Sequence, residues 1–171
     1  MSRMVGRPLV GLIASMALAA CATTPDAGPA AAAETISWSV GPCFGFCPVY
    51  TVAITPAGMV TFDGERNTTT LGRQVRQLTP QAYRAAAASL ARFRPATGTS
   101  GQTVCDQRIS DLSSTKIVWR RPGGAVTTLA HDKGCRSPRN DQLNAALQEL
   151  PATLGIEEWT RQLTRPGVPR G

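Results

Sequence analysis

Six stretches of the chain alternate between apolar and polar or small residues, the fourth only weakly, and this alternation is typical of β-strands. They cover residues 36–40, 50–55, 59–63, 71–78, 116–120 and 126–130. The turn sequences Pro56-Ala57-Gly58 and Pro122-Gly123-Gly124 lie inside two pairs of neighbouring stretches. The pattern therefore predicts two β-hairpins.

Two further stretches repeat apolar residues every three or four positions, as an amphipathic helix does. The repeated residues are Tyr83, Ala86, Leu90 and Phe93 in the first stretch and Leu143, Ala146, Leu147 and Leu150 in the second. Thr79-Pro80 and Ser137-Pro138 come before them, and a capping residue followed by proline is a helix start. Residues 97–102 are rich in Gly, Ser and Thr and are predicted to form a loop.

A hairpin precedes each predicted helix, and this order predicts the fold class. We expect an α+β domain made of two hairpin–helix (ββα) units. A single antiparallel sheet would carry both main helices on one face, because each helix has only one apolar side to bury. The domain is predicted to span residues 35–165, followed by a flexible tail at 166–171.

The first residues have the features of a lipoprotein signal peptide. Arg3 and Arg7 precede an apolar segment at 9–20, which is too short to span a bilayer as a helix. It ends in small residues directly before Cys21. We expect cleavage after residue 20 and acylation of Cys21 on its sulfur and its new amine, with residues 21–34 as an Ala/Pro-rich tether. The alternative is an ordinary secretory signal that a cysteine follows by chance.

An acylated Cys21 would anchor the domain to a membrane through its acyl chains. An aspartate after the acylated cysteine would favour the inner membrane, and this chain has Ala22 there. We therefore predict the periplasmic face of the outer membrane, with anchoring in the inner membrane as the alternative.

Four cysteines remain in the domain, and an exported protein lies in a compartment where disulfides persist. Of the three possible pairings, we favour Cys43–Cys47 with Cys105–Cys135. Cys43 and Cys47 lie between two prolines, with Gly45 between them, so a short bonded turn is feasible. A reactive dithiol at Cys43 and Cys47 and a zinc site are the alternatives, although neither has the usual spacing.

The string Gly41-Pro42-Cys43-Phe44-Gly45-Phe46-Cys47-Pro48-Val49-Tyr50, which runs into a hairpin, resembles the start of the DUF6438 family. Asp111-Leu112 before the strand at 116–120, His131 with Gly134-Cys135, and Trp159 also fit that family. The resemblance covers residues 36–159. It implies a small, mostly exported bacterial domain of uncharacterised function, and it implies no reaction.

The charge of the chain is basic, at +7, and loss of Arg3 and Arg7 with the signal peptide lowers it by two to +5. An envelope protein or an anionic lipid is a possible partner for such a surface. The arginines are scattered and no exposed aromatic residues lie among them, so we expect no nucleic-acid partner. We also expect no cofactor and no metal, since no phosphate loop or metal-ligand spacing is present.

The residue types suited to catalysis are few. His131 is the one histidine, and it is predicted to lie in a loop after the last strand. Its neighbour Asp132 would point away from it in an extended chain and is a poor partner. Asp111 and His131 are the candidate residues of a ligand-binding or hydrolase site.

Three functions follow from these observations. We favour a lipid-anchored, non-catalytic binding or envelope-maintenance module. The alternatives are a periplasmic thiol–disulfide protein that uses Cys43 and Cys47, and a small hydrolase or ligand-binding protein around Asp111 and His131.

Overall fold

The computed structural model describes residues 34–163 of the chain. The predicted signal peptide, Cys21, residues 22–33 of the tether and the tail at 166–171 lie outside the described residues. The mixed α+β class with a mostly antiparallel sheet is confirmed. Within the described residues, no helix has the length and apolar character that crossing a membrane requires.

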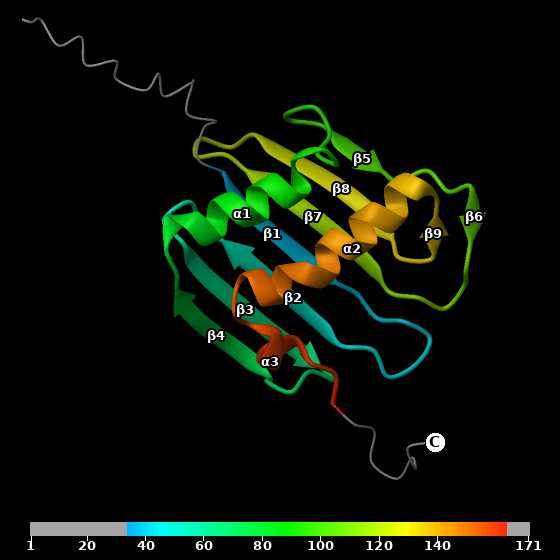
Figure 1. The fold of residues 1–171 in the computed structure, drawn as a ribbon, viewed down its shortest axis with the longest axis horizontal. Helices are drawn as coiled ribbons and strands as arrows, with labels where there is room; N and C mark the ends of the chain where they lie inside the picture. Colours follow the sequence, from blue (N-terminus) through cyan, green and yellow to red (C-terminus); the bar gives the residue numbers. More distant parts are fainter. Residues whose placement is uncertain (1–33, 164–171) are drawn as a thin grey trace, which may run out of the picture.

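The main sheet has seven strands in the order β4-β3-β2-β1-β7-β8-β5 (Figure 1). In chain order the strands are β1 (Thr35–Val40), β2 (Val49–Ile54), β3 (Met59–Arg66), β4 (Gly72–Gln77), β5 (Ser100–Gln102), β7 (Ser114–Arg120) and β8 (Val126–Asp132).

Strand β1 lies at the centre and pairs antiparallel with both β2 and β7. Trp38 is opposite Val52 on one side and Ile117 on the other, and all three side chains are buried. Every second residue along β1 is buried, as the alternating sequence predicted. The two ββα units are only an approximation, because β1 joins a three-stranded group, β2 to β4, to the β7–β8 hairpin.

Two strand pairings differ from the predicted single antiparallel sheet. Strand β5 lies in the predicted loop and pairs in parallel with β8. Its Gly101 packs where Pro95 leaves little room for a side chain, so its sequence lacks the apolar alternation of a strand. A second sheet pairs β6 (Gln107–Arg108) with β9 (Cys135–Arg136), next to the bond between Cys105 and Cys135.

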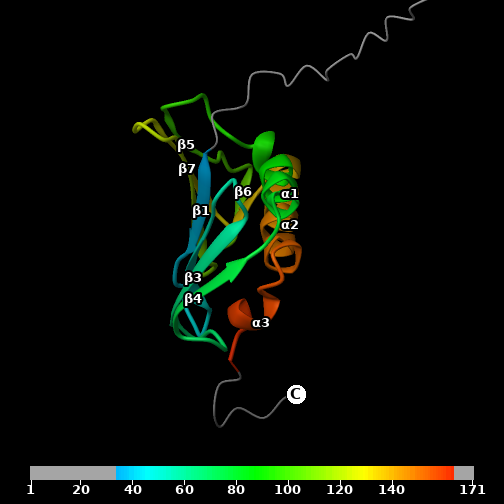
Figure 2. The ribbon, with the colours of Figure 1, turned by 90° about the vertical axis from the view of Figure 1, so that its left-hand side faces the viewer.

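Both main helices lie on one face of the sheet, as predicted (Figure 2). They are α1 (Pro80–Ala91) and α2 (Pro138–Thr153), and a short α3 (Glu157–Thr160) follows beside β3. The Ser137 hydroxyl caps α2 by accepting from the Asn140 amide at 3.1 Å, whereas the Thr79 side chain forms no cap bond. Leu90 and Leu143 bring the helices onto the core, which includes the buried Trp38.

The sheet has two ends that differ in what they carry. Strand β1 begins beside Glu34, and we call this side the Glu34 end; it also holds residues 55–58, 78–79, 92–99 and 120–125. The opposite side holds residues 41–48, 67–71, 103–113 and 133–136. We call it the disulfide end, because all four domain cysteines lie there.

Candidate functional site

The cysteines of the disulfide end are paired as we favoured from the sequence. The Sγ atoms of Cys43 and Cys47 are 1.94 Å apart, and those of Cys105 and Cys135 are 1.95 Å apart. A bonded cysteine is neither a nucleophile nor a metal ligand until it is reduced. In this state the four sulfurs act as covalent braces.

The first brace closes a tight turn between β1 and β2. The Cα atoms of Cys43 and Cys47 are 5.7 Å apart, and the Gly45 amide donates to the Cys43 carbonyl at 2.9 Å. Gly45 has a φ of 155°, which side chains rarely adopt, so glycine suits this position. The turn therefore holds Phe44 at its tip in a defined direction.

The second brace joins the segment after β5 to the segment after β8. Beside the Cys105–Cys135 bond, β6 pairs with β9, and the Ile109 amide donates to the Gly134 carbonyl at 2.9 Å. A Cβ on Gly134 would lie 1.9 Å from the Ile109 carbonyl oxygen, so only glycine allows this approach. The long loop is thus fixed by a bond, a small sheet and a close backbone contact.

The two braced loops meet. The Phe44 amide donates to the Asp111 carbonyl at 3.2 Å, and the Gly41 amide donates to the Ser114 carbonyl at 2.8 Å. Asp111 reaches this contact with a φ of 71°, a left-handed conformation that aspartate tolerates better than most residues. The disulfide end is therefore one braced unit.

This braced unit presents apolar side chains to solvent. Phe44 is 87% exposed, Ile109 49% and Leu112 47%. We call these three residues the apolar tip. A phenylalanine that a short disulfide turn holds in solvent loses little conformational freedom on binding, and rigid aromatic residues are common anchors in protein interfaces.

His131 lies on β8 and is 1% exposed, so its prediction as a loop residue is wrong. The strand continues one residue beyond it, because His131 and Thr115 of β7 are paired. Its Nε2 lies 2.9 Å from Asn144 Oδ1 and its Nδ1 lies 3.0 Å from the Thr103 hydroxyl.

The bonds of Asn144 fix how His131 is protonated. The Asn144 amide donates to the Lys133 carbonyl at 3.2 Å, so its Oδ1 faces the ring and accepts from Nε2–H. Nδ1 then accepts from Thr103. Burial lowers the pKa of His131 below its ordinary value, and Lys133 lowers it further, against the raising effects of Asn144 and Asp132. The imidazole is neutral and both nitrogens have partners, which is how a structural histidine is held.

Within residues 34–163, the structure shows no hydrogen bond between Asp111 and His131, the two residues of the predicted site. Asp111 is exposed in a turn, where its carboxylate accepts from the Ser110 hydroxyl at 3.1 Å. The hydrogen bonds of the His131 ring go to Thr103 and Asn144 instead. Asp132 is also occupied, since it accepts from the Gly134 amide at 2.8 Å and pairs with Arg108 at 2.9 Å.

A cleft of about 380 Å³ lies near the end of β1, the start of β7 and the end of β8. Glu65, Lys116, Asp132 and His131 are among its lining residues, so its charges have mixed signs. Thr115 also lines it and is 2% exposed, and among residues 34–163 its hydroxyl has no hydrogen-bond partner. Asp111 does not line this cleft.

Sequence reasoning did not find Thr103 or Asn144, because they come from separate segments and no spacing connects them to His131. Phe44 was considered only as part of the cysteine motif. Its position between two cysteines and beside a glycine could have predicted that its side chain is exposed. Nowhere in residues 34–163 do three or more His, Cys, Asp or Glu side chains gather as a metal ion would need.

Comparison with protein families finds a match over most of the described residues. The family model described as "Domain of unknown function (DUF6438)" matches residues 34–153, which include β1 to β9 and all but the last part of the helical layer. None of the curated proteins matches the chain.

Proposed function

This chain belongs to the DUF6438 family, and we propose that it is a lipid-anchored, non-catalytic binding module of the bacterial envelope. Cys21 would carry the acyl chains, and the domain would face the periplasm, on the outer membrane. The apolar tip would contact a protein partner in the envelope.

The observation that carries the proposal is the use of both disulfides at one end of the sheet. Together they brace the loops that hold Phe44, Ile109 and Leu112 in solvent. A braced loop lowers the entropy cost of a contact that is made through its exposed apolar side chains.

Two observations weigh against the alternative functions. The Cys43–Cys47 sulfurs are bonded and held in a turn before a strand, whereas redox dithiols lie at a helix start. His131 is buried with its ring nitrogens hydrogen-bonded to Thr103 and Asn144, and the Asp111 carboxylate is bonded to Ser110, so the predicted pair shares no hydrogen bond among the described residues.

Photo-cross-linking in living cells tests the proposal. A photoreactive amino acid replaces Phe44 in one strain and Leu71 in another, as a matched control, since Leu71 is 58% exposed and lies outside the apolar tip. We expect one discrete protein adduct from position 44 and none from position 71. Mass spectrometry of the same material should find an acylated Cys21.

Two results would contradict this proposal. One is an equal pattern of adducts from both positions, because the apolar tip would then have no special role. The other is an N-terminus without acyl chains, which would refute the anchor while leaving the binding surface to the cross-linking result.

A further inference from the structure

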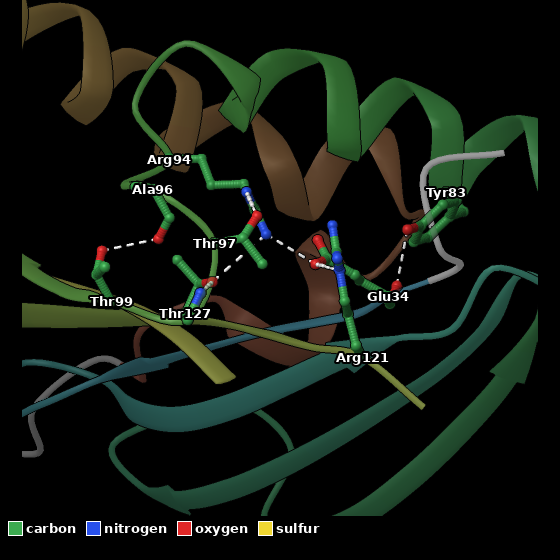
Figure 3. A network of polar contacts seen from close by, with 9 residues as sticks. Glu34, Tyr83, Arg94, Ala96, Thr97, Thr99, Arg121 and Thr127 are labelled. Carbon is green, nitrogen blue, oxygen red and sulfur yellow. Dashed lines mark hydrogen bonds and ion pairs between the residues drawn. The ribbon is translucent and has the colours of Figure 1, made fainter. Parts of the chain in front are cut away.

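Glu34 is held by three groups at the point where the described chain begins (Figure 3). Its carboxylate Oε1 lies 2.7 Å from Arg94 Nη2 and 2.9 Å from Arg121 Nε. Its carbonyl accepts from the Tyr83 hydroxyl at 2.7 Å. The Glu34 side chain is 13% exposed, so these bonds are partly shielded from water. They fix the position at which the predicted tether joins the domain.

The groups that hold Glu34 come from separate elements. Arg94 follows α1, Arg121 follows β7, and Tyr83 lies on α1. Arg94 also contacts the Thr97 hydroxyl at 3.0 Å, which ties the segment between α1 and β5 to the same cluster. The Glu34 end is therefore braced by charge, as the other end is braced by disulfides.

The two ends differ in net charge. The Glu34 end, as defined above, carries Arg92, Arg94, Arg120 and Arg121 against Glu34 alone, a balance of +3. At the disulfide end, Arg108, Lys133 and Arg136 against Asp106 and Asp111 leave a balance of only +1. The positive charge of the loops is thus higher at the end where the predicted tether joins the domain.

We propose that the Glu34 end is a docking surface for the anionic phospholipid headgroups of the membrane in which the chain is anchored. This inference rests on the acylated Cys21 of the proposed function. About 12 residues separate Cys21 from Glu34, a tether with an average span of roughly 19 Å if flexible. Along the chain, the Glu34 end is the part of the domain nearest to the predicted anchor, and electrostatic attraction acts within about 10 Å of a surface.

Two arginines are free to make this contact. Arg92 and Arg120 are exposed, and neither forms an ion pair with any residue of 34–163. Arg92 shares a surface groove with Glu149 of α2, so Arg120 is the less screened of the two. Docking through them would place the apolar tip at the far end of the sheet, away from the membrane and open to a partner.

Hydrogen exchange of the acylated, signal-free protein in vesicles tests this orientation. Vesicles of phosphatidylglycerol and phosphatidylethanolamine are compared with vesicles of neutral phosphatidylcholine, at low and at high salt. We expect slower amide exchange in residues 92–99 and 120–126 on the anionic vesicles only. High salt should remove the difference, because it screens the attraction.

Matched variants separate this surface from general charge. Arg92→Gln/Arg120→Gln removes two exposed charges from the Glu34 end, and Arg66→Gln/Arg161→Gln removes two exposed charges beside residues 67–71 of the disulfide end, where the Thr69 amide donates to the Arg161 carbonyl. The first variant should lose the protection by about fivefold or more, since each arginine near an anionic surface is attracted by about that factor. The second variant should keep it.

Three results would overturn the proposal. They are equal exchange on both kinds of vesicle, protection of residues 41–48 and 103–113 instead, and the same loss in both variants. An N-terminus without acyl chains would refute the anchor separately. In that case the same chain is sedimented with anionic vesicles, where binding that Arg92→Gln/Arg120→Gln abolishes supports the surface and no binding refutes it.

Discussion

The two disulfides should differ in what they contribute to stability. The Cys105–Cys135 bond closes a loop with a sequence separation of 30, and the Cys43–Cys47 bond closes one of 4. Loop-closure entropy then gives about 3.6 kcal/mol for the first bond and about 2 kcal/mol for the second. Cys135 is fully buried, so its replacement also leaves a small cavity and the first value is a lower bound.

The perturbation is a pair of alanine substitutions at each bond. For a domain of about 130 residues, Cys105→Ala/Cys135→Ala should lower the Tm by about 13 °C, and Cys43→Ala/Cys47→Ala by about 7 °C. Thermal and urea unfolding, followed by near-ultraviolet circular dichroism, measure both. Hydrogen exchange should also show faster exchange at the Ile109 amide in the first variant, while β1 stays protected.

The reverse order of the two losses would refute this reasoning. So would a loss below about 1 kcal/mol for Cys105→Ala/Cys135→Ala, since the bond would then constrain a loop that other contacts already hold.

Three further predictions concern buried groups at or next to the disulfide end. Thr115→Val should raise the free energy of unfolding by about 1 kcal/mol in urea denaturation, because it removes a buried hydroxyl without a partner within residues 34–163; a loss would mean that the hydroxyl is bonded. Gly134→Ala should lower it by about 2 kcal/mol or more, because its Cβ would meet the Ile109 carbonyl, whereas Gly41→Ala, with more room, should cost less. The pKa of His131 is lowered by burial, so below its ordinary 6.5 the unfolded chain binds a proton that the folded chain does not. The free energy of unfolding should be constant from pH 8 to about 6.5 and then fall by up to about 1.4 kcal/mol per pH unit, and a flat profile down to pH 5 would contradict this.

The alternating positions predicted most of the sheet. Residues such as Ile36 and Trp38 are buried on one face, so their period of two is a direct result of the pleat. The helices were predictable for the same reason, since Leu90 and Leu143 must reach the core. Burial on one side leaves a periodic signal in the sequence.

Other features leave no such signal. Strand β5 has only three residues. Its central residue is Gly101, where Pro95 leaves little room for a side chain, so the strand shows no apolar alternation. The pairing of β6 with β9 lies beside a bond between residues 30 positions apart in the sequence. The prediction of His131 as a loop residue was wrong because β8 continues past it in its pairing with β7, and its hydrogen-bond partners Thr103 and Asn144 come from distant segments.

The candidate site was predictable in its covalent part alone. Cysteine spacing and compartment were enough to favour both pairings. Strand order decides that both bonds brace the same end of the sheet. It also decides that Glu34 lies at the other end, between Arg94 and Arg121. Strand order is set by pairing between distant segments, which no local pattern encodes.

The redox state of the four domain cysteines in the cell tests the central claim most directly. Cells are lysed in acid, free thiols are alkylated before any reduction, and peptides that contain Cys43, Cys47, Cys105 and Cys135 are weighed by mass spectrometry. We predict that none of the four carries the alkylating group and that each pair is linked as in the structure. A substantial alkylated fraction at Cys43 and Cys47 would contradict the claim that these sulfurs serve as permanent braces.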